Sequence, residues 1–409
     1  MASYSVFNIN TVTVPTVTTV DPTTFTHLPA LGYKVMGSIF TTVSIFAFFA
    51  NGCGLLVFIR NKTLRSPTNL FIMSLSICDI LMALCSSMAC AASFSHGWVF
   101  GDVVCVLEGF MVYFLGLTSM YLLAAISVDR YIVISKPLMS YKITHRVAAT
   151  AISVCWGLGF FWAALPLVGW NHYSLEGVGI SCSIVWQSED PVNFSYIIVI
   201  FSFCFIFPLF LMAFSYYHVY MTIRNIVKCN VWNSKSRVAR KNLKLERKLF
   251  RTCLLMVCMY LLSWLPYTIV SFMSAFGAAK IISPLMATVP ALVAKCSGLW
   301  NPVIYIATNA QFRNALYELL PCSPLKKDLD NNTDARLGSS EDRTYKTRSG
   351  FSCEKKTKAG QMFDLTLMKD QIPVDQTVVE ELSPRVSPVN GRCVRIELSD
   401  LSMGNKADL

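Results

Sequence analysis

The chain has 409 residues, of which 54% are hydrophobic and only 14% charged, and its mean hydropathy is +0.50. Soluble domains carry charge on about 25% of their residues, so this composition excludes an ordinary soluble protein. The net charge of +11 comes from basic clusters that flank apolar runs, a placement that argues against nucleic-acid binding.

Seven apolar runs follow one another along the chain, and each is long enough to cross a bilayer. A spanning helix needs about 20 apolar residues, whereas the strands of a transmembrane β-barrel are short and alternate apolar with polar residues. The sequence therefore predicts an all-α membrane protein with a seven-transmembrane helix bundle. The predicted spans, numbered one to seven, cover approximately residues 34–60, 67–92, 104–128, 147–168, 194–222, 250–275 and 283–306.

The loops between the spans predict the orientation of the bundle. Loops rich in lysine and arginine alternate with loops poor in them, and basic loops stay in the cytoplasm. We therefore expect residues 1–33 to form an extracellular tail; they show no basic segment followed by an apolar core, so no cleavable signal peptide is expected. The C-terminus is predicted to lie inside. The basic positions are Arg60, Lys62, Arg65, Lys136, Lys142, Arg146 and a cluster between Arg224 and Lys248.

Two of the fifteen cysteines fall on the outer side in this orientation. Cys105 lies at the outer start of span three, and Cys182 lies in the loop between spans four and five. Because the outer side is oxidising, the sequence predicts a disulfide between them. Two free thiols are the alternative.

The motif "SVDRY", Ser127 to Tyr131, places two charged residues at the inner end of span three. A charge at this depth is costly unless it is paired. Glu246, at the inner end of span six, is available to pair with Arg130 beside Asp129. Such a pair would act as a latch between spans three and six; the alternative is a set of charges that snorkel to the interface.

Proline interrupts spans five, six and seven, at Pro208, Pro266 and Pro302. Proline removes a helical hydrogen bond and kinks the helix, so these spans are expected to pivot. Trp264, before the kink in span six, is predicted to point into the bundle.

Polar residues at mid-depth need partners. Asn51, Asp79 and Asn301 lie in spans one, two and seven, and buried polar groups are costly without hydrogen bonds. We expect them to share a water-filled network. Tyr216 and Tyr305, near the inner ends of spans five and seven, are predicted to reach Arg130 once the latch opens.

Lys295 is a lone ammonium group near the middle of span seven. Placing a lysine at the centre of a bilayer costs about 2.5–3.5 kcal/mol on insertion scales. Three interpretations stay open at this point: a snorkelling lysine, a partner for a charged ligand, or a nucleophile that forms a Schiff base with an aldehyde. A protonated Schiff base would need an anion, and Glu108 in span three and Glu176 in the outer loop are the candidates.

The C-terminal part divides into two predicted segments. Residues 309–322 have one apolar face and predict a short amphipathic cytoplasmic helix on the inner leaflet, ending at Cys322, which is a candidate for palmitoylation or a free thiol. Residues 323–409 are polar and are expected to be disordered. Candidate phosphosites in this tail are Ser339, Ser340, Thr344, Thr347, Ser349 and Ser352.

Together these features resemble the rhodopsin-like G-protein-coupled receptors, whose fold is a seven-helix bundle. The span-six motif of that family, usually "CWxP", reads "SWLP" here, with Ser263 in place of the cysteine. The matching positions are Asn51, Asp79, Cys105, Cys182, the triplet Asp129-Arg130-Tyr131, Pro208, Trp264, and "NPVIY" from Asn301 to Tyr305.

Within that family the chain resembles the opsins, because Lys295 stands six residues before the Asn-Pro pair. The resemblance implies that 11-cis-retinal binds Lys295 covalently. It places Glu108 at the counterion position of vertebrate visual pigments and Glu176 at that of many other opsins. The segment from "PALVAKCSGLWNPVIY" to Asn309 and Gln311 is similar to ciliary-type opsins, and the resemblance implies that these two residues contact a G protein. The chain departs from visual rhodopsins in its long third inner loop, its C-terminal tail, its N-terminal segment without a glycosylation sequon, and Leu117. These departures keep a non-visual or invertebrate opsin open.

The resemblance implies a light-activated receptor rather than an enzyme, located in the plasma membrane or a photoreceptor membrane. Its expected partners are a heterotrimeric G protein of the inhibitory or transducin type, and a receptor kinase and arrestin acting on the phosphorylated tail. The alternatives are an opsin-like retinal photoisomerase and a receptor for a diffusible ligand, in which Lys295 would be accidental. No metal is expected. The predicted walls of a retinal cavity are Tyr113, Gly116, Phe205, Trp264, Tyr267 and Ala291.

Overall fold

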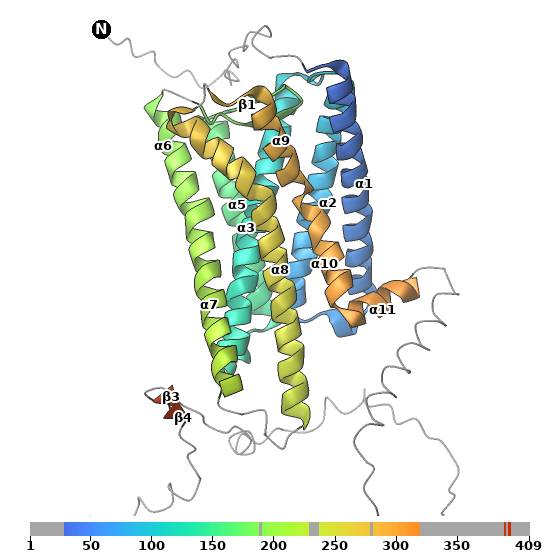
Figure 1. The fold of residues 1–409 in the computed structure, drawn as a ribbon, viewed down its shortest axis with the longest axis vertical. Helices are drawn as coiled ribbons and strands as arrows, with labels where there is room; N and C mark the ends of the chain where they lie inside the picture. The colour runs from blue at the N-terminus through green and yellow to red at the C-terminus, as the bar shows by residue number, and fades with distance from the viewer. Residues whose placement is uncertain are drawn as a thin grey trace, which may run out of the picture. The chain divides into compact units, whose positions relative to one another are not determined.

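The computed structural model describes residues 28–187, 190–228, 237–278 and 281–319, together with 388–389 and 392–393. The chain divides into two compact units, Met1–Lys326 and Lys327–Leu409. The described helices belong to the first unit, where they stand side by side as a bundle with β1 at one end and α11 at the other (Figure 1).

Six helical segments among the described residues are long and apolar enough to cross a membrane. They correspond to predicted spans one to six, which are therefore confirmed. The elements are α1 (Ala30–Arg60), α2 (Pro67–Phe94), α3 (Gly101–Ser135), α5 (His145–Ala164) with η3 (Leu165–Val168), α6 (Pro191–Ile200) with η4 (Phe201–Ile206) and α7 (Phe207–Lys228), and α8 (Arg237–Met273) with η6 (Ser274–Ala278); two short connectors are η2 (Lys62–Leu64) and α4 (Pro137–Ser140). α1 takes in the last four residues of the predicted tail.

Hydroxyl side chains fix where several helices begin. The Ser66 hydroxyl accepts a hydrogen bond from the Asn69 amide at 3.2 Å and Thr144 caps α5 in the same way at 3.3 Å. Pro67 follows Ser66 directly. Proline is favoured in the first helical turn because the N–H groups of that turn have no acceptor within the helix, so the absence of an N–H on proline costs nothing there. These two caps fix the starts of spans two and four, each at the end of a short inner loop.

Span five contains an irregular segment directly before Pro208. Residues Phe201–Ile206 form a π-helix, in which residue i+5 would donate to the carbonyl of residue i. The donor for Phe203 would therefore be Pro208, which has no N–H. The hydroxyl of Tyr121 in α3 donates to the Phe203 carbonyl instead, at 3.1 Å. The predicted irregularity at Pro208 is thus present, and it is stabilised from span three.

The seventh span is not one continuous helix. It consists of α9 (Pro284–Lys295), a 3₁₀ turn η8 (Cys296–Leu299) and α10 (Trp300–Thr308). Pro302 cannot donate to the carbonyl of Gly298, four residues earlier, and the Asn51 side chain donates to that carbonyl at 2.9 Å. Span one therefore supplies the hydrogen bond that the proline removes.

Asp79 and Asn301 complete the mid-depth polar cluster. The Asn301 amide donates to the Asp79 carboxylate at 2.7 Å. A Cβ atom on Gly298 would lie 2.8 Å from the same carboxylate, so only glycine allows α2 and span seven to approach this closely. Asn51, Asp79 and Asn301 thus have partners among the described residues, and the water-filled network expected to join them stays a prediction.

A two-stranded hairpin covers the outer end of the bundle. β1 (Tyr173–Glu176) pairs antiparallel with β2 (Ser181–Ile184), and the predicted Cys105–Cys182 disulfide joins β2 to α3. The Val178 amide donates to Thr288 in α9 at 2.9 Å. The outer loop is therefore fastened to spans three and seven.

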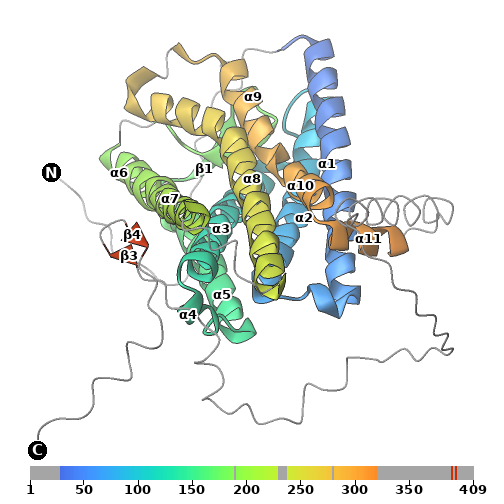
Figure 2. The ribbon, with the colours of Figure 1, turned by 60° about the horizontal axis from the view of Figure 1, so that its bottom comes forward.

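The predicted amphipathic helix is present as α11 (Ala310–Leu319), which leaves the end of α10 sideways (Figures 1 and 2). Phe312 is 2% exposed and packs against Phe58 and Tyr305, with ring centroids 5.3 and 5.0 Å away. Cys322 and most of the predicted tail 323–409 lie outside the described residues. In the second unit, β3 (Pro388–Val389) pairs with β4 (Arg392–Cys393).

We predict that Asn51→Ala lowers the free energy of unfolding by about 1–3 kcal/mol, because the buried Gly298 carbonyl loses its donor. The thermal unfolding midpoint of the purified protein measures this change. Ser38→Ala is the matched control, since the Ser38 hydroxyl is exposed and bonds only within its own helix, to the Lys34 carbonyl. Equal midpoints for the two variants would contradict the assigned role of Asn51.

Candidate functional site

The two residues that the sequence singles out at mid-membrane depth form an ion pair. Lys295 Nζ lies 2.8 Å from Glu108 Oε1, and the side chains are 4% and 0% exposed. Lys295 is the last residue of α9, directly before the 3₁₀ turn, and Glu108 lies in the second turn of α3. A buried charge is tolerated only with a well-placed partner, so this pair joins spans three and seven.

The outer hairpin holds the carboxylate in place. Glu108 Oε2 accepts a hydrogen bond from the Cys182 amide at 2.9 Å, and Cys182 is bonded to Cys105, three residues before Glu108. Each carboxylate oxygen thus has one strong donor, Lys295 Nζ on Oε1 and the Cys182 amide on Oε2.

Glu176 lies on the same cavity as Lys295 and is half-buried at the end of β1. Burial raises the pKa of Glu176 to about 7, while Lys295 and Tyr267 oppose that shift. The Tyr267 hydroxyl contacts Ser183 at 2.6 Å and accepts from the Trp186 indole at 3.0 Å. The structure therefore brings both predicted counterion candidates to the lysine, and only Glu108 is in direct contact with it.

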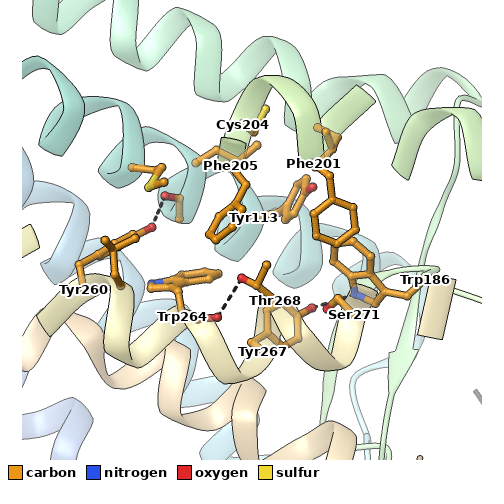
Figure 3. A pocket seen from close by; sticks show the side chains of 15 residues that line it. Tyr113, Trp186, Phe201, Cys204, Phe205, Tyr260, Trp264, Tyr267, Thr268 and Ser271 are labelled. Atoms are coloured by element: carbon orange, nitrogen blue, oxygen red, sulfur yellow. Dashed lines mark hydrogen bonds between the residues drawn. The ribbon is translucent and has the colours of Figure 1, made fainter. Parts of the chain in front are cut away.

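Two narrow cavities, of about 70 and 20 Å³, meet at Tyr113, Trp264 and Tyr267. The smaller contains Lys295 and the larger extends between spans three, five and six, with Trp264 and Tyr267 along α8 facing Tyr113 and Phe205 (Figure 3). All six predicted wall residues line one or both. Several other lining residues belong to no sequence motif and were not predicted: Met120, Ser183, Trp186, Phe201, Cys204, Tyr260 and Thr268.

Gly116 lets the indole of Trp264 lie against α3. A Cβ atom at position 116 would lie 2.6 Å from that ring, so any larger residue would push the tryptophan away. Trp264 is also stacked on Tyr260, with centroids 5.7 Å apart. The ring is therefore held between spans three and six at the centre of the site.

At the inner end of the bundle, the predicted pairing of Arg130 with Glu246 is present, and its action as a latch stays a prediction. Arg130 Nη1 lies 3.0 Å from Glu246 Oε2, and Arg130 also pairs with Asp129 at 2.5 Å. Thr68 in α2, which lies in no sequence motif and was not predicted, forms hydrogen bonds with both Asp129 and Arg130. Arg130 is 3% exposed and Glu246 33% exposed. Water can therefore hydrate the Glu246 carboxylate when the two side chains separate.

The tyrosines near the latch take three different environments. Tyr131 packs against Phe214 and His218 of α7, whereas Tyr216 packs against Phe250 of α8. The Tyr305 hydroxyl donates to Asn69 at 2.8 Å, which turns it toward α2. That Tyr216 and Tyr305 reach Arg130 after opening stays a prediction.

The proposed G-protein contacts lie at the start of α11. The Asn309 side chain accepts from the Phe312 amide at 3.1 Å, so it caps this helix. The side chain of Gln311, like Cys322, lies outside the described residues.

Comparison with known proteins places these features in a family. Residues 50–305 match the 7 transmembrane receptor (rhodopsin family) model. Parapinopsin of Ictalurus punctatus is 34% identical over 313 residues, covering 75% of this chain and 89% of that protein. Pinopsin of Gallus gallus is 35% identical over 289 residues, covering 70% and 80%. The crystal structure of squid rhodopsin aligns with a TM-score of 0.68 at 30% identity, covering 72% and 87%.

We predict that Glu176 makes the protein less stable as pH rises. Its pKa of about 7 exceeds its ordinary value of 4.5, so the folded state binds a proton more tightly than the unfolded state. The free energy of unfolding should fall between those two pH values. Thermal midpoints measured across this range should fall with pH in the parent protein and change less in Glu176→Gln. Parallel profiles would contradict the raised pKa of Glu176.

Proposed function

This chain belongs to the rhodopsin family of seven-transmembrane receptors and, within it, to the opsins, and we propose that it senses light through 11-cis-retinal held as a Schiff base on Lys295. Its function as a light-sensing receptor follows from the family. The attachment site is supported by one observation above the others, the fully buried Lys295–Glu108 pair.

The residues around Lys295 fit a long apolar aldehyde. The amine opens on a cavity whose walls are mainly aromatic and aliphatic, and the lysine is the only ammonium group among the described lining residues. A retinoid is larger than either cavity, so binding would require the aromatic side chains between them to move apart. When bound, retinal would supply a light-driven change of shape directly beside the ion pair.

Glu108 would act as the counterion in this proposal. Lys295 Nζ would hold retinal, with loss of one water from the amine and the aldehyde, and Glu108 would balance the positive charge kept on that nitrogen. The Cys182 amide holds the Glu108 carboxylate in position for this role. Because the pKa of Glu176 is about 7, this residue would be the second proton acceptor or donor near neutral pH.

Opening would proceed from the outer to the inner ion pair. Weakening of the Lys295–Glu108 pair frees span seven from span three, Trp264 moves, and α8 pivots at Pro266. Arg130 keeps Asp129 and Thr68 when it loses Glu246, so no buried charge is left alone. The latch can therefore break at low cost and expose an inner cleft.

A heterotrimeric G protein of the inhibitory or transducin type would bind in that cleft, with Asn309 and Gln311 nearby. A receptor kinase and arrestin would act on the predicted phosphosites of the tail, which lie outside the described residues. The expected location is the plasma membrane or a photoreceptor membrane. The intact latch favours signalling over photoisomerisation, which would need no such contact at the inner face.

We predict that Lys295→Ala abolishes the visible absorption band formed with 11-cis-retinal, because no amine remains in the cavity. Acid trapping and mass analysis should find the retinal adduct on the peptide that contains Lys295 in the parent protein. Light should then stimulate nucleotide exchange on an inhibitory-type G protein, and the variant should not respond. Lys34→Ala, which removes an exposed lysine of α1, should keep both signals. An unmodified Lys295 in retinal-loaded protein would refute the proposal.

A second prediction concerns the counterion. Glu108→Gln should lower the pKa of the Schiff base, because the neutral side chain no longer stabilises the cation. The pigment should then absorb in the ultraviolet near neutral pH, as an absorption spectrum would record. Glu176→Gln is the matched comparison and should keep the visible band. The reverse pattern would assign the counterion to Glu176.

A further inference from the structure

Two tryptophan–serine hydrogen bonds cross between spans six and seven in opposite directions. The Trp264 indole of α8 donates to Ser297 Oγ in η8 at 3.1 Å. The Trp300 indole of α10 donates to Ser263 Oγ in α8 at 3.2 Å. Each span therefore supplies one donor and one acceptor.

The backbone of span seven makes this reciprocal pairing available. Ser297 and Trp300 are three residues apart, and η8 is a 3₁₀ turn, in which residues i and i+3 lie over one another. Ser263 and Trp264 are neighbours that stand three and two residues before Pro266. The non-α turn after Lys295 thus presents the Ser297 hydroxyl, and the first residue of α10 presents the Trp300 indole, to the kinked part of span six.

The hydroxyl of Ser263 is arranged as an acceptor for Trp300. Its own proton is donated to the Met259 carbonyl at 2.9 Å, which leaves its lone pairs for the indole. Ser263 is 5% and Ser297 7% exposed. An indole N–H can only donate, so in this apolar setting loss of either serine hydroxyl leaves a donor unsatisfied. A cysteine at position 263 would be a weaker acceptor.

Both bonds lie next to the groups that respond to the ligand. Ser297 follows Lys295 by two residues, and Trp264 lines both cavities. A shift of the lysine or of the indole therefore acts on the same two hydrogen bonds. At the inner end, Thr252 of α8 donates to Thr308 of α10 at 2.8 Å, so spans six and seven are fastened at two depths.

We propose that Ser263 and Trp300 are positioning residues, which together with the Trp264–Ser297 bond hold span six against span seven in the inactive receptor and set the threshold for opening. This proposal rests on the proposed function, because it concerns the same opening of α8. The bonds stabilise the closed arrangement selectively, since a pivot at Pro266 changes the position of Ser263 relative to span seven. Serine at position 263 thereby lowers signalling in the dark.

The test measures nucleotide exchange by an inhibitory-type G protein with the full chain in lipid nanodiscs, free of retinal and in the dark. Ser263→Ala and Trp300→Phe should each raise basal exchange about tenfold, which corresponds to about 1.4 kcal/mol. The double variant should show no more than the larger single effect, because both substitutions remove one hydrogen bond. Ser263→Thr keeps the hydroxyl and should match the parent protein.

Ser86→Ala is the matched control. Ser86 is 1% exposed and its hydroxyl donates to the Met82 carbonyl within α2 at 2.8 Å, so it reproduces the loss of a buried hydroxyl without an indole partner. It should leave basal exchange unchanged. Where Ser263→Ala gives too little folded protein, Ser263→Cys replaces it and should give a smaller rise.

Unchanged basal exchange in Ser263→Ala and Trp300→Phe, or effects that multiply in the double variant, would overturn the proposal. A lower thermal midpoint without increased exchange would also overturn the proposal, because Ser263 and Trp300 would then have only a structural role. Failure of the proposed function is a separate result: the parent protein would then form no pigment or show no light-dependent exchange.

Discussion

A positive charge inside a low-dielectric bundle must be balanced, and this requirement fixes the outer half of the molecule. Lys295 finds its carboxylate partner at this depth in Glu108, which is wholly buried and lies 2.8 Å away. Glu108 in turn needs a second donor, which the Cys182 amide supplies, and the disulfide holds that amide beside α3. The positions of span three, span seven and the outer hairpin therefore depend on one another.

The two ion pairs of the bundle differ in exposure to water, and this difference fits the role proposed for each pair. The outer pair is closed to water, so separating it requires a new partner for the lysine or a transfer of its proton. The inner pair contains Glu246, which is 33% exposed and can be hydrated when Arg130 is released. Once the outer pair is weakened, the inner pair can separate more easily, because Glu246 is hydrated as it leaves Arg130.

Irregular backbone lies where these motions would begin. The π segment before Pro208 and the 3₁₀ turn before Pro302 each leave a carbonyl that a neighbouring span must satisfy, through Tyr121 and Asn51 respectively. Polar side chains on straight helices therefore hold the bent ones in place. Such cross-span hydrogen bonds permit a second arrangement, because the backbone they stabilise is already outside the regular helical pattern.

The sequence by itself determined that the chain lies in a membrane, the positions of the spans, the Cys105–Cys182 disulfide, and the residues Lys295, Glu108, Arg130 and Glu246. These features follow from hydropathy, loop charge and motifs, which are local properties. Only the tertiary structure decided that span seven is broken after Lys295, that Thr68 joins the latch, that Trp186 reaches Tyr267, and that Ser263 receives the indole of Trp300. The physical reason is that an apolar run predicts burial in a membrane but not which faces of two helices pack together. That packing decides where each buried polar group finds its hydrogen-bond partner.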